Sequence, residues 1–325
     1  MDTARSTPAP ARPHFVTTSH GQLRVWTLGS GPAVIVLPGL LKSPGQRACE
    51  CAERLPGCHV IAVELPGLGA SSAGTGPALQ IAEAALRSWI DGLDQPVALL
   101  AFDLAGPLAA RLSMLCPRIA TRLWLESDRH QQAQDAFSPL QGLELQWDGT
   151  HLVRLWSHLR DQDMRDPARP LRARTEGPPY LSAEELDDAL LCFGQDTAQY
   201  QALWNALAQA SPEVGRGIAR GDFSHAEALA DFGLRTAPLG RLSAAMPAQG
   251  IVRQYVDVSR GRVHLRRAGH GPQLLLAFLA GAGSSANLDP LLAGLADRFT
   301  VVAPDYIGQG GGLLVFSAIS DGTQS

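Results

Sequence analysis

The stretch Ala101-Phe102-Asp103-Leu104-Ala105-Gly106 places a charged side chain between an apolar run and the start of a helix. The run 97–100 before it is short and wholly apolar, which is typical of a buried strand, and Pro107 is typical of a first helical turn. The small residues at 101, 105 and 106 allow a sharp strand-to-helix turn with Asp103 at its apex. Such a turn presents a nucleophile, here a carboxylate that attacks carbon. The alternative is that Asp103 is only a helix N-cap.

Composition predicts an ordinary globular protein of one large α/β domain with an insertion, or of two domains. The chain has 325 residues, of which 45% are hydrophobic and 18% charged, with a formal net charge of −4. This charge does not favour a nucleic-acid or anionic-membrane partner, and no run of eighteen apolar residues predicts a membrane span. Residues 1–13 lack the apolar segment of a secretory signal, so we expect a loose tail and a cytoplasmic protein.

The five cysteines do not suggest a disulfide framework, because their number is odd and the chain is long. A reducing compartment fits this usage. Cys49, Cys51, Cys58 and His59 lie close enough in sequence to raise the question of a zinc site. Their spacing is not that of paired zinc ligands, however, so we predict packing of small apolar side chains and no metal.

Apolar runs alternate with helical periodicity over the first part of the chain. The predicted strands cover residues 22–27, 33–37, 60–63, 97–100 and 121–125, and the predicted helices cover 47–55, 78–93 and 107–115. Such alternation predicts an α/β fold with a mostly parallel sheet and helices on both faces.

The loop Glu64-Leu65-Pro66-Gly67-Leu68-Gly69-Ala70-Ser71 resembles the D-x-P-G-x-G-x-S loop of the α/β-hydrolase superfamily. With the Asp103 turn, residues 14–129 resemble the core of that fold, and the aspartate resembles the nucleophile of haloalkane dehalogenases and epoxide hydrolases. The resemblance implies an oxyanion site formed by the backbone N–H groups of Leu40 and Leu104. In this chain Pro38 replaces the histidine that the family usually has in the loop before Leu40.

In residues 130–250 the alternation of strands and helices gives way to helical segments separated by proline and glycine. We expect these residues to form an inserted helical cap and linker. In the superfamily such a cap covers the nucleophile. Tyr180 or Tyr200 could polarise an epoxide there, although aromatic residues at helical spacing more often belong to a core. The same alternative applies to the tryptophans of the segment, at positions 147, 156 and 204.

An internal repeat is predicted, because residues 251–325 begin like the first part of the chain. Four residues recur 240 positions later, namely Gly21, Gly29, Gly31 and Pro32 as Gly261, Gly269, Gly271 and Pro272. A further four recur 241 positions later, namely Val60, Ala62, Gly67 and Gly69 as Val301, Ala303, Gly308 and Gly310. This partial second copy has no nucleophile turn of its own.

Two arrangements of residues 251–325 are open. They could be a fragment of a second hydrolase domain, or the runs 273–279 and 300–303 could dock as closing strands of the first sheet. We favour docking, because parallel strands need cover and the segment after residue 130 lacks a strong strand pair.

The predicted chemistry needs a base and an acid beside Asp103. The resemblance implies a late histidine that activates water, but no histidine follows His270. His225, in a glycine-containing break, is the candidate that replaces it, with His130 as a weaker one. Glu126 follows the predicted strand 121–125, 23 residues after Asp103, which predicts both carboxylates at one sheet edge.

Two functions therefore remain open. One is a hydrolase with a carboxylate nucleophile, acting on a haloalkane, epoxide or ester-like small molecule without a cofactor. The other is a degenerate or truncated tandem hydrolase without activity, which binds a ligand or has no function. Dinucleotide binding is disfavoured, because no third glycine completes the Gly67-Leu68-Gly69 pattern. The sequence does not specify an oligomeric state.

Overall fold

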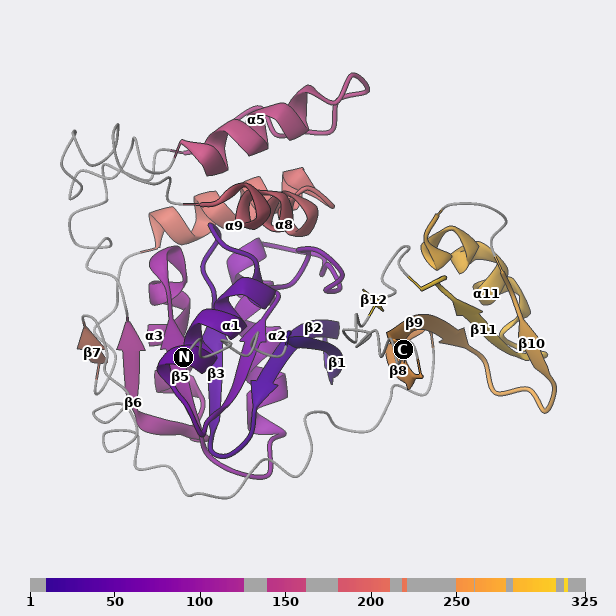
Figure 1. Ribbon diagram of the computed structural model, residues 1–325, viewed down its shortest axis with the longest axis horizontal. Coiled ribbons are helices and arrows are strands. Elements are labelled where there is room, and N and C mark those ends of the chain that lie inside the picture. The colour runs from indigo at the N-terminus through magenta and orange to yellow at the C-terminus, as the bar shows by residue number, and fades with distance from the viewer. Residues whose placement is uncertain are drawn as a thin grey trace, which may run out of the picture. The chain divides into compact units, whose positions relative to one another are not determined.

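The computed structural model describes residues 10–125, 139–161, 181–210, 218–220, 250–259, 261–278, 283–307 and 313–314 (Figure 1). The chain divides into two compact units, Met1–Ala244 and Ala245–Ser325. None of the described helices is long and apolar enough to cross a membrane.

The first unit contains a seven-stranded mixed sheet with the order β1-β2-β4-β3-β5-β6-β7. Its strands are β1 (Arg12–Thr18), β2 (Gly21–Gly29), β3 (Ala33–Leu37), β4 (His59–Val63), β5 (Val97–Ala101), β6 (Ile119–Leu125) and β7 (Ile218–Arg220). The strands from β4 to β7 in this order pair in parallel, whereas β1 and β2 form an antiparallel hairpin and β2 pairs antiparallel with β4. The predicted mostly parallel α/β sheet is confirmed.

The helices in the described part of this unit are α1 (Pro44–Arg54), α2 (Ala78–Asp91), α3 (Gly106–Leu115), α5 (Thr150–Arg160), α8 (Ala183–Phe193) and α9 (Thr197–Gln209). Local sequence explains their starts. Ser43 and Gln46 form a capping box at α1, and Ser182 and Glu185 form another at α8. Pro107 lies in the first turn of α3, as predicted.

The alternation of side chains in β3 builds two hydrophobic layers, one on each face of the sheet. Ile35 and Leu37 face the larger cluster, which also contains residues of α2, α3 and α9. Val34 and Val36 face the smaller cluster with residues of α1. Every residue of β3 and β5 is buried, as expected for central parallel strands.

One boundary of the predicted organisation is wrong. Arg12 and Pro13 were expected in a loose tail of residues 1–13, but they belong to β1, where they pair with Thr27 and Trp26 of β2. The hairpin places them at the edge of the sheet as the structure describes it, and edge strands admit proline.

The second unit has a sheet of its own, with the order β10-β11-β9-β12 and with β8 paired to β9. Its elements are β8 (Val252–Val258), β9 (Gly261–Ala268), β10 (Leu274–Leu276), η2 (Ser285–Leu288), α11 (Asp289–Leu295), β11 (Thr300–Pro304) and β12 (Leu313–Leu314). The expectation that the runs 273–279 and 300–303 close the first sheet is therefore corrected. The described strands in those runs, β10 and β11, pair with each other in parallel, and β11 also pairs with β9.

Candidate functional site

Asp103 stands on a strained turn between β5 and α3. Its φ of 47° makes it the single non-glycine residue with positive φ among those that the structure describes. A residue with a Cβ pays about 1–2 kcal/mol for this conformation. Two backbone hydrogen bonds hold the turn, from Phe102 N–H to Leu37 O at 3.0 Å and from Ala105 N–H to Phe102 O at 3.0 Å. The predicted position of Asp103 at the apex of a sharp turn is confirmed.

The Asp103 carboxylate does not cap the helix that follows it. The short helix η1 (Asp103–Ala105) and α3 have no side-chain cap, and the residues at their N-cap positions are Phe102 and Ala105. The alternative interpretation of Asp103 as an N-cap is therefore wrong in the described structure.

Asp103 is instead paired with Arg47 of α1. The Arg47 Nη2 atom donates to Asp103 Oδ2 at 3.1 Å, and the two side chains are only 8% and 4% exposed. Arg47 also donates from Nη1 to Glu50 Oε2 at 2.9 Å and from Nε to Pro38 O at 3.4 Å. Its guanidinium lies over the Phe102 ring, 4.1 Å from the centroid. The arginine thus ties α1, the loop after β3 and the turn into one buried network.

The loop after β3 comes close to the carboxylate at Gly39. A Cβ added to Gly39 would lie 3.0 Å from Phe102 O and 3.2 Å from Asp103 Oδ2, and the residue has a φ of 73°. Only glycine satisfies both the conformation and the spacing. The predicted oxyanion donors flank this contact, since Leu40 directly follows Gly39 and Leu104 directly follows Asp103. Both leucines are buried.

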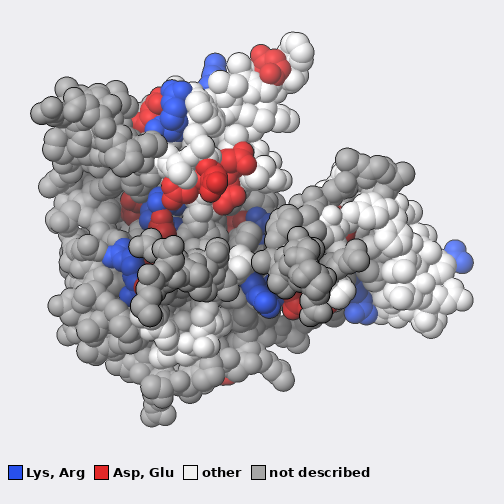
Figure 2. Space-filling view, viewed as in Figure 1, with Lys and Arg blue, Asp and Glu red and all other residues white. Residues whose placement is uncertain are grey.

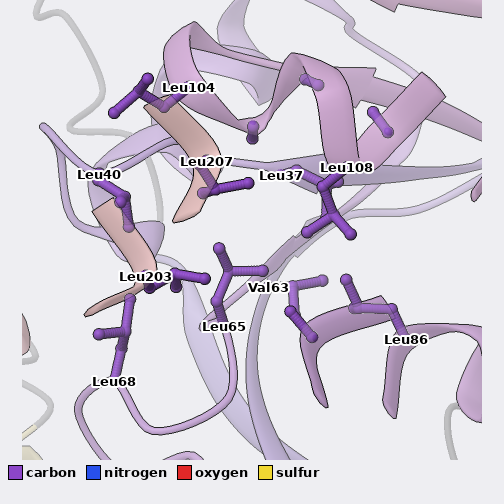
Figure 3. Packing of buried hydrophobic residues seen from close by; sticks show 14 of the residues in the cluster. Leu37, Leu40, Val63, Leu65, Leu68, Leu86, Leu104, Leu108, Leu203 and Leu207 are labelled. Carbon is purple, nitrogen blue, oxygen red and sulfur yellow. The ribbon is translucent and has the colours of Figure 1, made fainter. Parts of the chain in front are cut away.

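Helix α9 covers the turn. The Tyr200 hydroxyl donates to Leu40 O at 2.8 Å, and both residues are fully buried. Burial raises the pKa of Tyr200 well above its usual value. Figure 3 shows Leu203 of α9 near Leu65 and Leu68, and Leu203 and Leu207 belong to the same hydrophobic cluster as Leu40 and Leu104. Apolar side chains of α9 therefore occupy the space next to the predicted oxyanion donors.

The loop after β4 is held by the buried carboxylate of Glu64. Arg24 donates to it from Nη2 at 2.6 Å, and the backbone N–H groups of Ala70 and Ser71 donate to its other oxygen at 2.5 and 2.9 Å. Gly69 must be glycine, because a Cβ there would lie 2.5 Å from the Glu64 carboxylate. In the loop 64–71, the backbone at the end of the loop thus bonds to the side chain of its first residue, Glu64.

Helix α8 is joined to the core by this loop and by a charged network. Gly69 N–H donates to Cys192 O at 3.0 Å, and Cys192 Sγ lies 3.6 Å from Glu64 Oε2. Lys42 bridges Glu185 of α8, at 2.9 Å, and Glu50 of α1. Figure 2 shows acidic side chains gathered over α8.

The charges in this network shift each other's pKa. Burial lowers the pKa of Lys42, but its hydrogen bonds to Glu50 and Glu185 outweigh burial and leave the pKa raised. Burial likewise opposes the ionised form of Glu185, while the Ser182 N–H and Lys42 outweigh it and lower the pKa. Both shifts favour the charged pair that links α8 to the core.

Several predicted residues lie outside the described part of the chain, namely Glu126, His130, Tyr180 and His225. Their catalytic roles stay predictions. Of the aromatic residues expected near a pocket, Trp204 is buried against His158 with ring centroids 4.5 Å apart, whereas Trp147 is 99% exposed.

The cysteines do not gather into a site in the described residues. All five are free thiols, and Cys51 and Cys58 pack in the smaller hydrophobic cluster. No group of three or more histidine, cysteine or acidic side chains placed to hold a metal occurs in the parts of the chain that the structure describes.

Arg47 is the site residue that the sequence analysis did not identify. It was assigned only to a helix, and its partner is 56 residues away in sequence. One signal was present, since Arg47 is followed by Ala48 and Cys51 on the face of α1 that packs against the sheet. A charged residue on such a face needs a buried counter-charge.

The first unit has an α/β fold with a mixed, mostly parallel sheet and helices on both faces. No family model matches the chain, and no curated protein does.

Solved structures similar to this chain include an epoxide hydrolase from an endophytic Streptomyces, with 16% identity over 62% of this chain and 73% of that one and a TM-score of 0.44. An epoxide hydrolase from Vigna radiata has 17% identity over 61% and 72%, with a TM-score of 0.46. A putative alpha/beta hydrolase from Nostoc has 16% identity over 61% and 72%, with a TM-score of 0.45.

Proposed function

We propose that the first unit is a hydrolase that uses Asp103 as a carboxylate nucleophile on a small molecule with an electrophilic carbon. The substrate class is a haloalkane, an epoxide or an ester. The observation that carries the proposal is the φ of 47° at Asp103. Strained backbone of this kind persists where the surrounding structure holds it, and it clusters at active sites. A turn without a chemical task could use glycine at no strain.

The reaction has two steps. First, an Asp103 oxygen forms a bond to the substrate carbon, while the bond to the halide or oxygen breaks and the leaving group takes the electron pair. The product is an ester on Asp103, or an anhydride if the substrate is an ester. Water then adds to the Asp103 carboxyl carbon, and the bond from that carbon to the oxygen bound to the substrate carbon breaks. The substrate leaves with this oxygen as an alcohol, which takes up a proton from the water, or from an anhydride as a carboxylate, and the Asp103 carboxylate is regenerated. A base takes the proton of the water, and His225 and Glu126 are the proposed pair for this task.

Arg47 has two opposite effects on this reaction. Its guanidinium, with Nη2 3.1 Å from Asp103 Oδ2, holds the carboxylate in a fixed position for attack. In the second step a negative oxygen forms at the same carboxyl carbon, and a cation already in place stabilises it, together with the N–H groups proposed for Leu40 and Leu104. In the covalent ester, however, Asp103 carries no charge, so the buried guanidinium loses the counter-charge at Oδ2.

The second candidate is a non-catalytic protein with the same fold, and that loss of charge favours it. Breaking a buried ion pair costs about 3–5 kcal/mol, which would destabilise the ester relative to the free enzyme. The cover of Tyr200 and the α9 leucines over the turn favours this candidate as well. Asp103 would then only hold α1 and the turn together.

The test is to incubate the full chain with a bromoalkane, styrene oxide and an aryl ester and to measure intact mass. The expected result is an adduct that peptide mapping locates on Asp103 and that is absent from Asp103→Asn. If the ester turns over, a single turnover in ¹⁸O-water places the label in the Asp103 carboxylate. A folded wild-type chain that forms neither adduct nor product would establish the non-catalytic candidate.

A further inference from the structure

The two units share one strand register. In the first unit β2 pairs with β4 through Val25↔Val63 and Leu28↔Val60. In the second unit β9 pairs with β11 through Leu265↔Pro304 and Ala268↔Val301. The β9 residues lie 240 positions after their β2 counterparts, and the β11 residues lie 241 positions after their β4 counterparts. The adjoining backbone bond is also matched, since Glu64 N–H donates to Arg24 O at 3.0 Å and Asp305 N–H donates to His264 O at 2.8 Å.

The close backbone approaches are matched too. A Cβ on Gly29, with a φ of 81°, would lie 2.3 Å from Cys58 O. A Cβ on Gly269, with a φ of 77°, would lie 2.1 Å from Phe299 O, and 299 is 241 residues after 58. Equal glycine contacts at equal registers indicate that the second unit is built like the start of the first.

This register makes β10 the counterpart of β3. His59 N–H donates to Pro32 O at 2.9 Å in the first unit, and Thr300 N–H donates to Gln273 O at 2.9 Å in the second. Strand β3 is central, because it pairs with β4 on one edge and in parallel with β5 on the other. Among the described residues β10 pairs with β11 alone.

The face of β10 that corresponds to the larger core is exposed. In β3, Ala33, Ile35 and Leu37 face the larger cluster and are at most 4% exposed. Their counterparts 241 residues later are Leu274, Leu276 and Phe278, with exposures of 65%, 55% and 55%.

The opposite face of the same small sheet is covered. Val301 and Ala303 of β11 are fully buried against Leu292 of α11, which takes the place that α1 has in the first unit. At β10 the sheet of the second unit therefore has an exposed apolar face, whereas the opposite face of the sheet is covered at β11.

We propose that Leu274, Leu276 and Phe278, with the outer edge of β10, form a docking surface for a parallel apolar strand followed by a helix, supplied by another polypeptide. The occupant is defined by the first unit, where β5 pairs with β3 through Val34↔Ala98 and the helices α2 and α3 pack on the same face. The surface also has the matching chemistry, since residues 274–278 carry no charge. Unpaired edges that must stay single usually carry charged residues or proline.

The experiment titrates the full chain into a fluorescein-labelled peptide of residues 96–115, which contains β5, the turn and α3 in sequence, and follows anisotropy. We expect saturable binding, with at least a tenfold weaker affinity for Leu276→Asp. The matched control is Leu291→Asp, an equally apolar residue of α11 that is 45% exposed and should leave binding unchanged. A peptide with Leu99→Asp should not bind.

Three results would overturn the proposal. They are no binding to the wild-type chain, binding that Leu276→Asp does not weaken, and a concentration-dependent dimer that Leu276→Asp abolishes while the peptide does not bind. The last result would make the surface an interface between two copies. Hydrogen exchange of β9 and β11 amides shows that each variant keeps the second unit folded, which is expected because position 276 is more than half exposed.

Discussion

The Tyr200 hydroxyl donates to the Leu40 carbonyl at 2.8 Å, so a helix from late in the first unit is bonded to the loop beside Asp103. We expect Tyr200→Phe to lower the free energy of unfolding of this unit by about 1–3 kcal/mol, because a buried carbonyl loses its donor. Urea unfolding followed by tryptophan fluorescence measures this unit alone, since all six tryptophans precede residue 245. Tyr306→Phe, in the second unit and 46% exposed, is the control that should not move the midpoint.

Arg47 and Asp103 should be strongly coupled in stability. Arg47→Met and Asp103→Asn each break the ion pair at Asp103 Oδ2, and in the second variant the guanidinium keeps its bond to Glu50, so each change should cost up to about 3–5 kcal/mol. The double variant should cost clearly less than the sum of the two, by about 1 kcal/mol or more. Additive losses in the same unfolding experiment would show that the pair contributes no interaction energy.

The strain at Asp103 can be separated from its charge. Asp103→Gly and Asp103→Ala both remove the carboxylate, but only alanine retains the cost of a φ of 47°. We expect the glycine variant to be the more stable of the two, by about 1 kcal/mol. The converse order, measured by thermal unfolding, would mean that the turn relaxes to an unstrained backbone when the carboxylate is absent.

Acid should weaken the attachment of α8. The folded-state pKa of Glu185 lies below its usual 4.5, where burial opposes the shift and the bonds from Ser182 and Lys42 outweigh it. Its stabilising effect is therefore present above the unfolded-state pKa and is lost as the pH falls through the folded-state pKa. Lys42→Met should flatten the decline of stability below about pH 4.5. An acid decline that is the same in the variant and the wild type would contradict this assignment.

The buried thiols should resist alkylation. Burial first, and then the nearby Asp91 carboxylate, raises the pKa of Cys116 to about 12, while burial and Glu64 raise that of Cys192 well above the usual value. The thiolate is the reactive form, so iodoacetamide at pH 8 should label Cys49, which is partly exposed, before either of them. Peptide mass spectrometry over time checks the order. Early labelling of Cys192 would show that α8 separates from the loop at Glu64.

The local parts of the site could be predicted from the sequence, because their signals are local. Small residues around Asp103 and an apolar run before it are sufficient to predict the turn. Apolar runs likewise predict β3 and β4, and helical periodicity predicts α2. Arg47 could not be found this way, because its role depends on a partner 56 residues away and on which face of α1 meets the sheet. Tyr200 was a candidate, but for polarising a substrate and not for bonding to Leu40.

The second unit shows the same limit at a larger scale. The recurring glycines predicted where strands and turns lie, and β9 to β11 follow that prediction. Sheet membership could not be predicted, because an apolar strand such as β10 fits any parallel neighbour equally well. In the structure β10 pairs in parallel with β11, and η2 and α11 link the two strands in sequence.

The pair Arg24 and Glu64 has a counterpart in His264 and Asp305, whose Nδ1 and Oδ2 atoms are 2.8 Å apart. An arginine is always charged, whereas a histidine can donate the same bond in its neutral form. On the correspondence of registers proposed above, this position requires a donor aimed at a carboxylate, and it does not require a permanent cation. Between the two pairs, arginine is exchanged for histidine and glutamate for aspartate. A substitution table scores these as two separate changes, although together they preserve one interaction.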